Sequence, residues 1–91
     1  MGLYWIDMYK IYYSDQFKKN IKKFDSVRQK LIFAKIKFLK NDPDHPSLRT
    51  EKLDGERWAS SVNMGVRLIW ELYGDAINII DVGKHDIYRK Y

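Results

Sequence analysis

The chain has 91 residues, 45% of them apolar and 15% aromatic, which fits a single folded domain spanning residues 1–91 and excludes a disordered chain. It has no cysteine and only two histidines, so we expect no disulfide, no thiolate nucleophile, no metal site and no cofactor. No apolar run approaches the ~20 residues of a membrane span, and the first residues lack the pattern of a secretory signal. We therefore expect a cytoplasmic protein that does not associate with a membrane.

The net charge of +5 is unevenly distributed along the chain. Residues 1–46 contain 10 lysines and arginines against 5 acidic residues, whereas residues 47–91 contain 7 of each. A lysine-rich stripe of this kind attracts a polyanion or an acidic protein. It also fits a solvated helix face, and composition alone leaves both readings open.

The first half of the chain predicts a strand followed by two helices. Residues 9–14 are β-branched and aromatic, which is typical of a strand. Met8 precedes this strand directly, so residues 1–7 could be an upstream extension with Met8 as the functional start. Ser14 can cap a first helix, and the spacing of its apolar residues is helical. That row consists of Phe17, Ile21 and Phe24.

Asp25 and Ser26 offer a second cap, from which a longer helix is expected to run from Val27 to about Lys40. Two apolar rows lie side by side on this helix: Leu31, Ala34 and Phe38, and Ile32, Ile36 and Leu39. Two prolines in residues 41–47 end the helix, and the chain to residue 57 is expected to be a loop. The helices should form an antiparallel pair joined by a short break.

The second half predicts a three-stranded meander over residues 58–63, 66–73 and 76–82, with two-residue turns at 64–65 and 74–75. The expected fold is a single α+β domain of order β-α-α-β-β-β, with the helix pair packed on one face of a small antiparallel sheet. Strand alternation places Val66, Leu68, Trp70 and Leu72 on the helix-covered face, with Trp70 opposite Ile79 and Leu72 opposite Ile77. The other face should hold Arg67, Ile69, Glu71 and Tyr73, joined by Trp58, Ser60, Val62, Asn78, Ile80 and Val82.

On this reading Arg67 is a neighbour of the C-terminal tail, which contains Lys84, His85, Tyr88, Arg89 and Tyr91. These residues could form a metal-free site for phosphate chemistry. RNA can be cut by its own 2′-hydroxyl if groups near it move protons and cations stabilise the developing charge. Histidine titrates near neutrality, and the arginine fork matches phosphate oxygens.

Simpler roles remain open for the same residues. The tail could pack over the sheet edge, and its cations could be solvated. Glu71 could be a base or a salt-bridge partner, and Trp58 could stack on a base or pack in the protein. His45, which lies between an aspartate and a proline, is expected to be structural or to face solvent.

The chain resembles the RelE/ParE toxin superfamily in residues 8 to 91. The segments that carry the resemblance are the HPSLRTEKLDG loop, the VNMGVRLIWEL strand pair and the closing IIDVGKHDIY. The resemblance implies the toxin of a type II toxin–antitoxin system, which is a monomer when free and is neutralised by a cognate antitoxin. RelE-like members of the superfamily cut mRNA on the ribosome, and ParE-like members inhibit DNA gyrase.

The resemblance also implies roles for individual residues. Arg67 matches the arginine that contacts the scissile phosphate in RelE-like nucleases. His85 matches a position that holds arginine or histidine and is the best candidate for proton transfer. Tyr88 and Tyr91 both match positions of a tail tyrosine, and Lys84 and Arg89 would add phosphate contacts.

This sequence departs from RelE at several positions. RelE has lysines where this chain has Trp58 and Ser60, which we keep as candidates for RNA or phosphate binding. The glutamate of the YoeB branch has no match, and the nearest position holds Ser47. The histidine–tyrosine tail favours a ribosome-dependent endoribonuclease over a gyrase inhibitor, and an inactive binding module is the remaining alternative.

Overall fold

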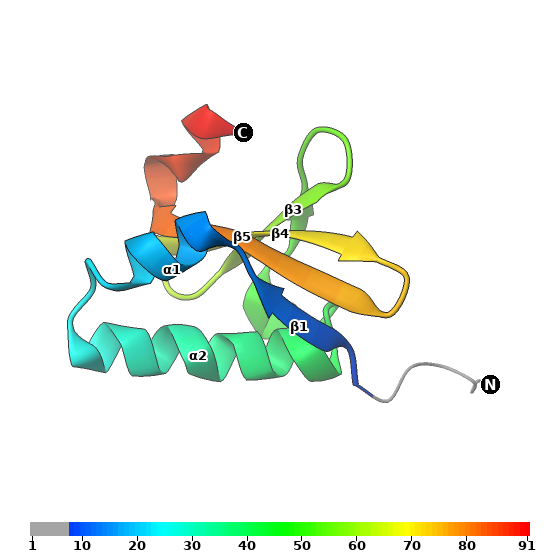
Figure 1. Ribbon diagram of the computed structural model, residues 1–91, viewed down its shortest axis with the longest axis horizontal. Coiled ribbons are helices and arrows are strands. Elements are labelled where there is room, and N and C mark those ends of the chain that lie inside the picture. Colours follow the sequence, from blue (N-terminus) through cyan, green and yellow to red (C-terminus); the bar gives the residue numbers. More distant parts are fainter. Residues whose placement is uncertain (1–7) are drawn as a thin grey trace.

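The computed structural model describes residues 8–91 and has the α+β architecture predicted from the sequence (Figure 1). The prediction about residues 1–7 lies outside this range. The elements in chain order are β1 (Lys10–Tyr13), α1 (Asp15–Ile21), α2 (Ser26–Asn41), the short 3₁₀ helix η1 (Pro46–Leu48), β2 (Glu51–Lys52), β3 (Arg57–Ser61), β4 (Val66–Tyr73), β5 (Ala76–Lys84) and the 3₁₀ helix η2 (His85–Lys90).

Five strands form one sheet in the order β1-β5-β4-β3-β2. The pairs β2–β3, β3–β4 and β4–β5 are antiparallel, but β1 is parallel to β5. The sheet is therefore mixed, and the prediction of a purely antiparallel sheet was wrong in this detail. The segment predicted as a loop up to residue 57 also contains η1 and the two-residue strand β2.

The helix starts are capped by the residues that the sequence predicts. The Ser14 side chain accepts a hydrogen bond from the Phe17 N–H and donates one to the carbonyl of Ile80 in β5. The Asp25 carboxylate accepts from the Arg28 N–H at 2.8 Å. Each cap satisfies a backbone donor that a helix start leaves without an intrahelical partner.

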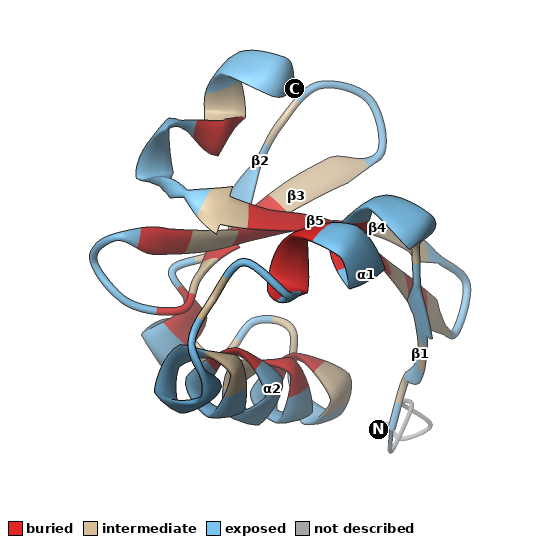
Figure 2. Ribbon diagram, turned by 60° about the vertical axis from the view of Figure 1, so that its left-hand side comes forward, coloured by how far each residue is buried: buried red, intermediate tan, exposed pale blue. Residues whose placement is uncertain are grey.

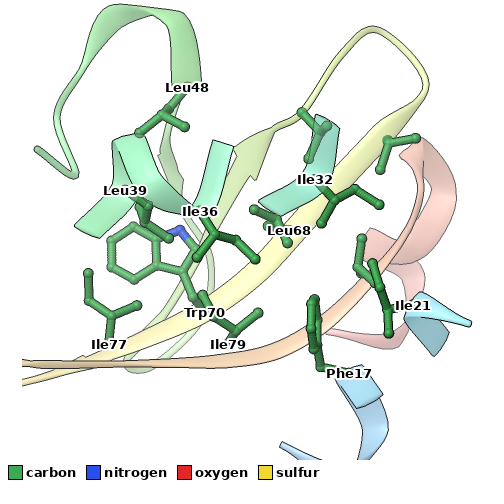
Figure 3. Packing of buried hydrophobic residues seen from close by; sticks show 13 residues of the cluster. Phe17, Ile21, Ile32, Ile36, Leu39, Leu48, Leu68, Trp70, Ile77 and Ile79 are labelled. Carbon is green, nitrogen blue, oxygen red and sulfur yellow. The ribbon is translucent and has the colours of Figure 1, made fainter. Parts of the chain in front are cut away.

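The main core lies between the sheet and the two helices, with α2 running across the face below the strands (Figures 1 and 3). Trp70 and Leu68 of β4 pack there against Ile32, Ile36 and Leu39 of α2, all of them buried. Of the two apolar rows predicted on α2, this second row is the buried one. The first row faces outward, and its members Leu31 and Phe38 are 37% and 43% exposed.

The β4–β5 hairpin closes with the predicted two-residue turn. Tyr73 pairs with Ala76, and Gly74 between them has a positive φ of 57°, a conformation that glycine adopts without steric cost. The predicted pairs of Trp70 with Ile79 and of Leu72 with Ile77 are confirmed.

The other face of the sheet carries a smaller core, which η2 covers (Figure 2). Ala59, Ile69 and Ile87 are buried in it, with Tyr88 and Tyr91 packed around them. This face is therefore partly closed by the tail. Within residues 8–91, no helix is long and apolar enough to span a bilayer.

Candidate functional site

The loop between β3 and β4 decides which side chains share the face of Arg67. We predicted a two-residue turn at 64–65, but Ser61 pairs with Arg67, and the Val62 N–H donates to the Val66 carbonyl at 2.9 Å, which leaves a three-residue loop, 63–65. A register change of one residue moves every side chain of a strand to the opposite face. Trp58 and Ser60 therefore lie on the helix-covered face, and so does Val62.

The contacts of Trp58 and Ser60 confirm this placement. The Ser60 hydroxyl is fully buried and accepts a hydrogen bond from Nε1 of Trp70 at 2.9 Å. The Trp58 ring stacks on Trp70 with 5.9 Å between the ring centroids. The prediction that Trp58 and Ser60 share the face of Arg67 was therefore wrong, and the site proposed below does not include them.

A β-bulge in β5 changes which of its residues face Arg67. Ile69 pairs with Asp81 while its neighbour Trp70 pairs with Ile79, so Ile80 is an extra residue in β5. Beyond the bulge Val82 is opposite Leu68 and is buried in the main core. The prediction that Val82 faces the Arg67 side was therefore wrong, and Asp81 and Gly83 take that side instead.

Arg67 lies beside the start of the tail, as predicted, where the bulge places it opposite Gly83. Its guanidinium contacts both the tail and the β3–β4 loop. Nε donates a hydrogen bond to the hydroxyl of Tyr88 at 3.0 Å. Nη1 donates to the carbonyls of Asn63 at 2.6 Å and Met64 at 3.2 Å. Within residues 8–91 Nη2 has no such acceptor, so this nitrogen is available for a ligand.

The Tyr88 hydroxyl lies between a cation and a carboxylate. Burial raises the pKa of Tyr88, the Arg67 guanidinium lowers it, and the nearby carboxylate of Glu51 raises it. Glu51 pairs with Ala59, and Ala59 pairs with Ile69, so all three share the tail-covered face. Because the hydroxyl accepts from Arg67, its own proton is free to be donated to Glu51.

Tyr91 is attached to the sheet by a buried carboxylate. Its hydroxyl donates to Oδ2 of Asp81 at 2.8 Å, and Oδ1 of Asp81 accepts from Nδ2 of Asn20 at 2.6 Å and from the Val82 N–H at 2.8 Å. Burial, followed by the bond to Asp81, raises the pKa of Tyr91 to about 12. Tyr91 therefore stays protonated at neutral pH and acts here as a hydrogen-bond donor.

His85, Lys84 and Arg89 are exposed and line a different part of the molecule, a cleft of about 1040 Å³. The cleft is bounded by the α1–α2 turn, the β3–β4 loop and the tail. The backbone N–H of His85 donates to the carbonyl of Gly65 at 3.0 Å. Loop 63–65 thus holds Arg67 through Asn63 and Met64 and holds His85 through Gly65, and it joins the two halves of the predicted site.

Sequence reasoning missed Glu51, Asp81 and Asn20. Glu51 was assigned to a loop, and no sequence signal marked it. Asp81 interrupts an apolar strand, and Asn20 follows Phe17 at the three-residue spacing of a helix face, so both were polar residues at buried positions. That signal was present and could have identified them.

Two other candidates have structural roles. Nδ1 of His45 accepts from the Ser47 N–H at 3.2 Å and caps η1, and its ring contacts Phe38 at 5.0 Å between centroids. Glu71 accepts from the Tyr73 hydroxyl at 2.9 Å and lies 3.9 Å from Nε of Arg57. The structural role expected for His45 is confirmed, and Glu71 is a salt-bridge partner of Arg57.

Comparisons with known proteins identify the fold. No family model and no curated protein matches the sequence. Among solved structures, a chain of the archaeal RelE–RelB complex from Pyrococcus horikoshii OT3 is 14% identical, with a TM-score of 0.75, over 88% of this chain and 98% of that one. A chain of the DinJ–YafQ toxin–antitoxin complex from E. coli is 19% identical, with a TM-score of 0.72, over 87% and 94%.

A YoeB/ParE toxin from Agrobacterium tumefaciens is 17% identical, with a TM-score of 0.70, over 84% of this chain and 98% of that one. These likenesses extend over most of both chains in each pair and include the helix pair as well as the sheet. The protein therefore has the RelE-like fold that the sequence predicted.

Proposed function

We propose that the protein is the toxin of a type II toxin–antitoxin system and a metal-independent, ribosome-dependent mRNA endoribonuclease. The observation that carries the proposal is the attachment of Arg67 and His85 to one three-residue loop, 63–65. The loop thus brings the Arg67 guanidinium, which suits phosphate, and the backbone of His85, whose side chain can transfer protons, to one corner of a RelE-like fold.

In the proposed reaction the 2′-hydroxyl of the mRNA attacks the adjacent phosphorus. The bond from phosphorus to the 5′-oxygen breaks, which leaves a 2′,3′-cyclic phosphate and a free 5′-hydroxyl. Arg67 stabilises the extra negative charge through Nη2, and His85 takes the proton of the 2′-hydroxyl and returns a proton to the leaving 5′-oxygen. Tyr88 orients Arg67, and Tyr91 fixes the tail on the sheet, so both are positioning residues in this scheme.

Lys84 and Arg89 contact phosphates next to the reacting one, and the exposed lysines of α1 and of the turn that follows it bind ribosomal RNA. Lys18, Lys19, Lys22 and Lys23 form that second group. Contacts of lysine with phosphate are sensitive to salt and independent of sequence. In this scheme the lysines supply affinity for the ribosome, and Arg67 and the tail carry out the reaction.

The proposed partner is a cognate antitoxin that binds a monomeric toxin. Two of the similar structures are toxin–antitoxin complexes, RelE–RelB and DinJ–YafQ. A groove between β1 and α2 offers a suitable surface, because Tyr13 and Phe33 are 37% and 42% exposed there beside Lys30 and Lys37. Exposed aromatic rings with a cationic border fit an acidic protein segment.

Primer extension on cellular mRNA after brief induction tests the proposal. The wild type should produce new 5′ ends inside coding regions, and Arg67→Ala and His85→Ala should not. Removing one group that stabilises a transition state typically costs about 10²- to 10³-fold in rate. His45→Ala is the matched control for histidine loss and should cut like the wild type.

Other outcomes would point to other functions. Growth arrest with DNA damage signalling and uncut mRNA would replace the nuclease with a gyrase inhibitor. Harmless expression without cuts would leave an inactive binding module. Cleavage of purified mRNA in the absence of ribosomes would contradict the ribosome dependence and leave the proposed nuclease activity intact.

A further inference from the structure

Helix α2 presents a second apolar row to solvent, on the side opposite its buried row (Figure 2). Val27, Leu31 and Phe38 are 75%, 37% and 43% exposed, and Ala34 between them is exposed as well. Exposed apolar side chains are common singly, but a continuous row along three turns of a helix is typical of an interaction surface. We call these four residues the outer seam.

The spacing of the outer seam is that of a coiled coil. Its residues follow one another in steps of four, three and four, which places Leu31 and Phe38 at position a of a heptad and Val27 and Ala34 at position d. At 3.6 residues per turn the row covers roughly 60° of the helix circumference over about 16 Å. A helix that lies in a lipid interface has a broad apolar face, whereas so narrow a stripe fits a single partner helix.

Cations border the outer seam on both sides. The heptad positions e and g, which flank the seam, are held by Arg28, Lys30, Lys35 and Lys37, and α2 contains no acidic residue. Arg28 pairs with Asp25 at 2.8 Å, whereas the three lysines have no carboxylate of residues 8–91 within salt-bridge distance. Charges at e and g determine which helix can pair with a seam, so the missing partner of these lysines is acidic.

The same charges disfavour a second copy of this chain as the partner. Two copies of α2 packed through the outer seam would place cations opposite cations in a parallel and in an antiparallel arrangement, because every e and g position is basic. Like charges in such positions act against pairing. The Nζ of Lys35 lies 5.4 Å from the centroid of the Phe38 ring, so its charge is held at the edge of the seam, where a carboxylate of a partner could reach it.

We propose that the outer seam of α2 binds an amphipathic helix of a partner protein, with apolar residues at a and d and acidic residues at e and g. Ala34 is small, so the partner residue that packs on it is large, such as leucine. This surface differs from the groove between β1 and α2, because only Ala34 of the four seam residues also borders that groove. The inference uses only the spacing, exposure and charge of α2 and does not rest on the proposed nuclease.

Fluorescence anisotropy with a designed peptide tests the proposal on the full chain. The labelled peptide has about three heptads, with leucine at a and d and glutamate at e and g, and its own like charges keep it from pairing with itself. It should bind at least about 10-fold more tightly than a scrambled peptide of the same composition, because only the ordered peptide can place its leucines on the seam. The same heptad peptide with lysine at e and g should not bind.

Variants of the protein locate the site. Leu31→Gln/Phe38→Gln should weaken the acidic peptide by about 10-fold or more. Met8→Gln/Met64→Gln changes two other exposed apolar residues, 56% and 90% exposed, and should leave the affinity unchanged. Phe33→Gln, in the groove, should also bind like the wild type.

Charge reversal gives a readout that loss of folding cannot imitate. Lys35→Glu/Lys37→Glu should weaken the peptide with glutamate at e and g and should create binding of the peptide with lysine there. Thermal melts establish that each variant is folded before its binding is interpreted.

Three results would overturn the proposal. Equal affinity for the ordered and scrambled peptides would reduce the interaction to net charge, and binding that Phe33→Gln abolishes while Leu31→Gln/Phe38→Gln retains it would place the peptide in the groove. A protein that is dimeric by sedimentation velocity, or that binds phosphatidylserine vesicles, in each case only with the seam intact, would assign the seam to a second copy or to a lipid surface. Because peptide binding is measured without RNA, its outcome is independent of whether mRNA is cut.

Discussion

The Nε of Arg67 and the hydroxyl of Tyr88 are 3.0 Å apart and joined by a hydrogen bond, so the tail holds the residue to which we assign phosphate binding. The contact joins β4 to η2, and β5 separates these two elements in the sequence. Four predictions about this tail follow from its contacts.

Tyr88→Phe should remove the acceptor of the Arg67 Nε–H and lower the free energy of unfolding by about 1.5 kcal/mol, because hydrogen bonds to charged groups contribute more than neutral ones. Urea denaturation measures the change. Tyr73→Phe removes a hydroxyl that donates to Glu71 at an exposed site and should change stability by less than about 0.5 kcal/mol. If Tyr88→Phe and Arg67→Ala have fully additive effects, the two side chains are not coupled.

Tyr91 should be the last tyrosine to titrate, because burial and Asp81 raise its pKa to about 12. A pKa that is higher in the folded than in the unfolded state stabilises the fold below the unfolded value of about 10. That contribution should therefore be complete below pH 10 and disappear as the pH rises from about 10 to 12. Ultraviolet titration of phenolate and unfolding measurements across this range, on the wild type and Tyr91→Phe, test both statements. Equal slopes of stability against pH for the two proteins would contradict the assignment.

Asp81→Ala should destabilise the protein by about 2–4 kcal/mol, since it leaves the buried Asn20 amide and the Val82 N–H without an acceptor. Asp81→Asn retains one acceptor oxygen and should cost less, while lowering the pKa of Tyr91 by removing the carboxylate. Asp75→Ala, an exposed position whose carboxylate lies 3.6 Å from Lys10, is the control and should cost less than about 1 kcal/mol. Chemical denaturation of the three variants should rank them in this order, and a mild effect of Asp81→Ala would show that the carboxylate does not support the tail.

Gly83→Ala should loosen the tail, because a Cβ at this position would lie 2.8 Å from Cδ1 of Ile87, which is buried. Overpacking of this kind costs about 1–3 kcal/mol. Ile87→Val removes that methyl group, so adding it to Gly83→Ala should recover part of the lost stability. Gly65→Ala meets no atom closer than 3.8 Å and is the matched control. Thermal melts of the single and double variants would contradict the clash if the two substitutions are simply additive.

Local patterns in the sequence predict most of the fold. The caps at Ser14 and Asp25, the helical spacing of Ile32, Ile36 and Leu39, and the Gly74 turn each depend on a few adjacent residues, and each is confirmed. Local patterns could not predict the parallel pairing of β1 with β5, because this pairing joins segments that are distant in sequence.

The errors in the site have two local causes. A loop of three residues instead of two moved Trp58 and Ser60 to the helix-covered face, and one extra residue at Ile80 reversed the direction of Val82. Strand alternation carries a single-residue error along the whole strand, so a small mistake at a turn changes the membership of a site. The face on which Arg67 lies was predicted correctly, because it follows from alternation within β4, and the extra residue lies in β5.

The parallel pairing of β1 with β5 also governs the order in which a newly made chain can fold. Residues 10–13 emerge early but have no strand to pair with until residues 76–79 have been synthesised. Contacts between such distant segments form late, because a long loop must be closed first. A chain whose synthesis stops before β5 lacks the strand with which β1 pairs, and it also lacks the tail whose Tyr88 contacts Arg67. A chain interrupted before β5 is therefore expected to lack the site proposed here.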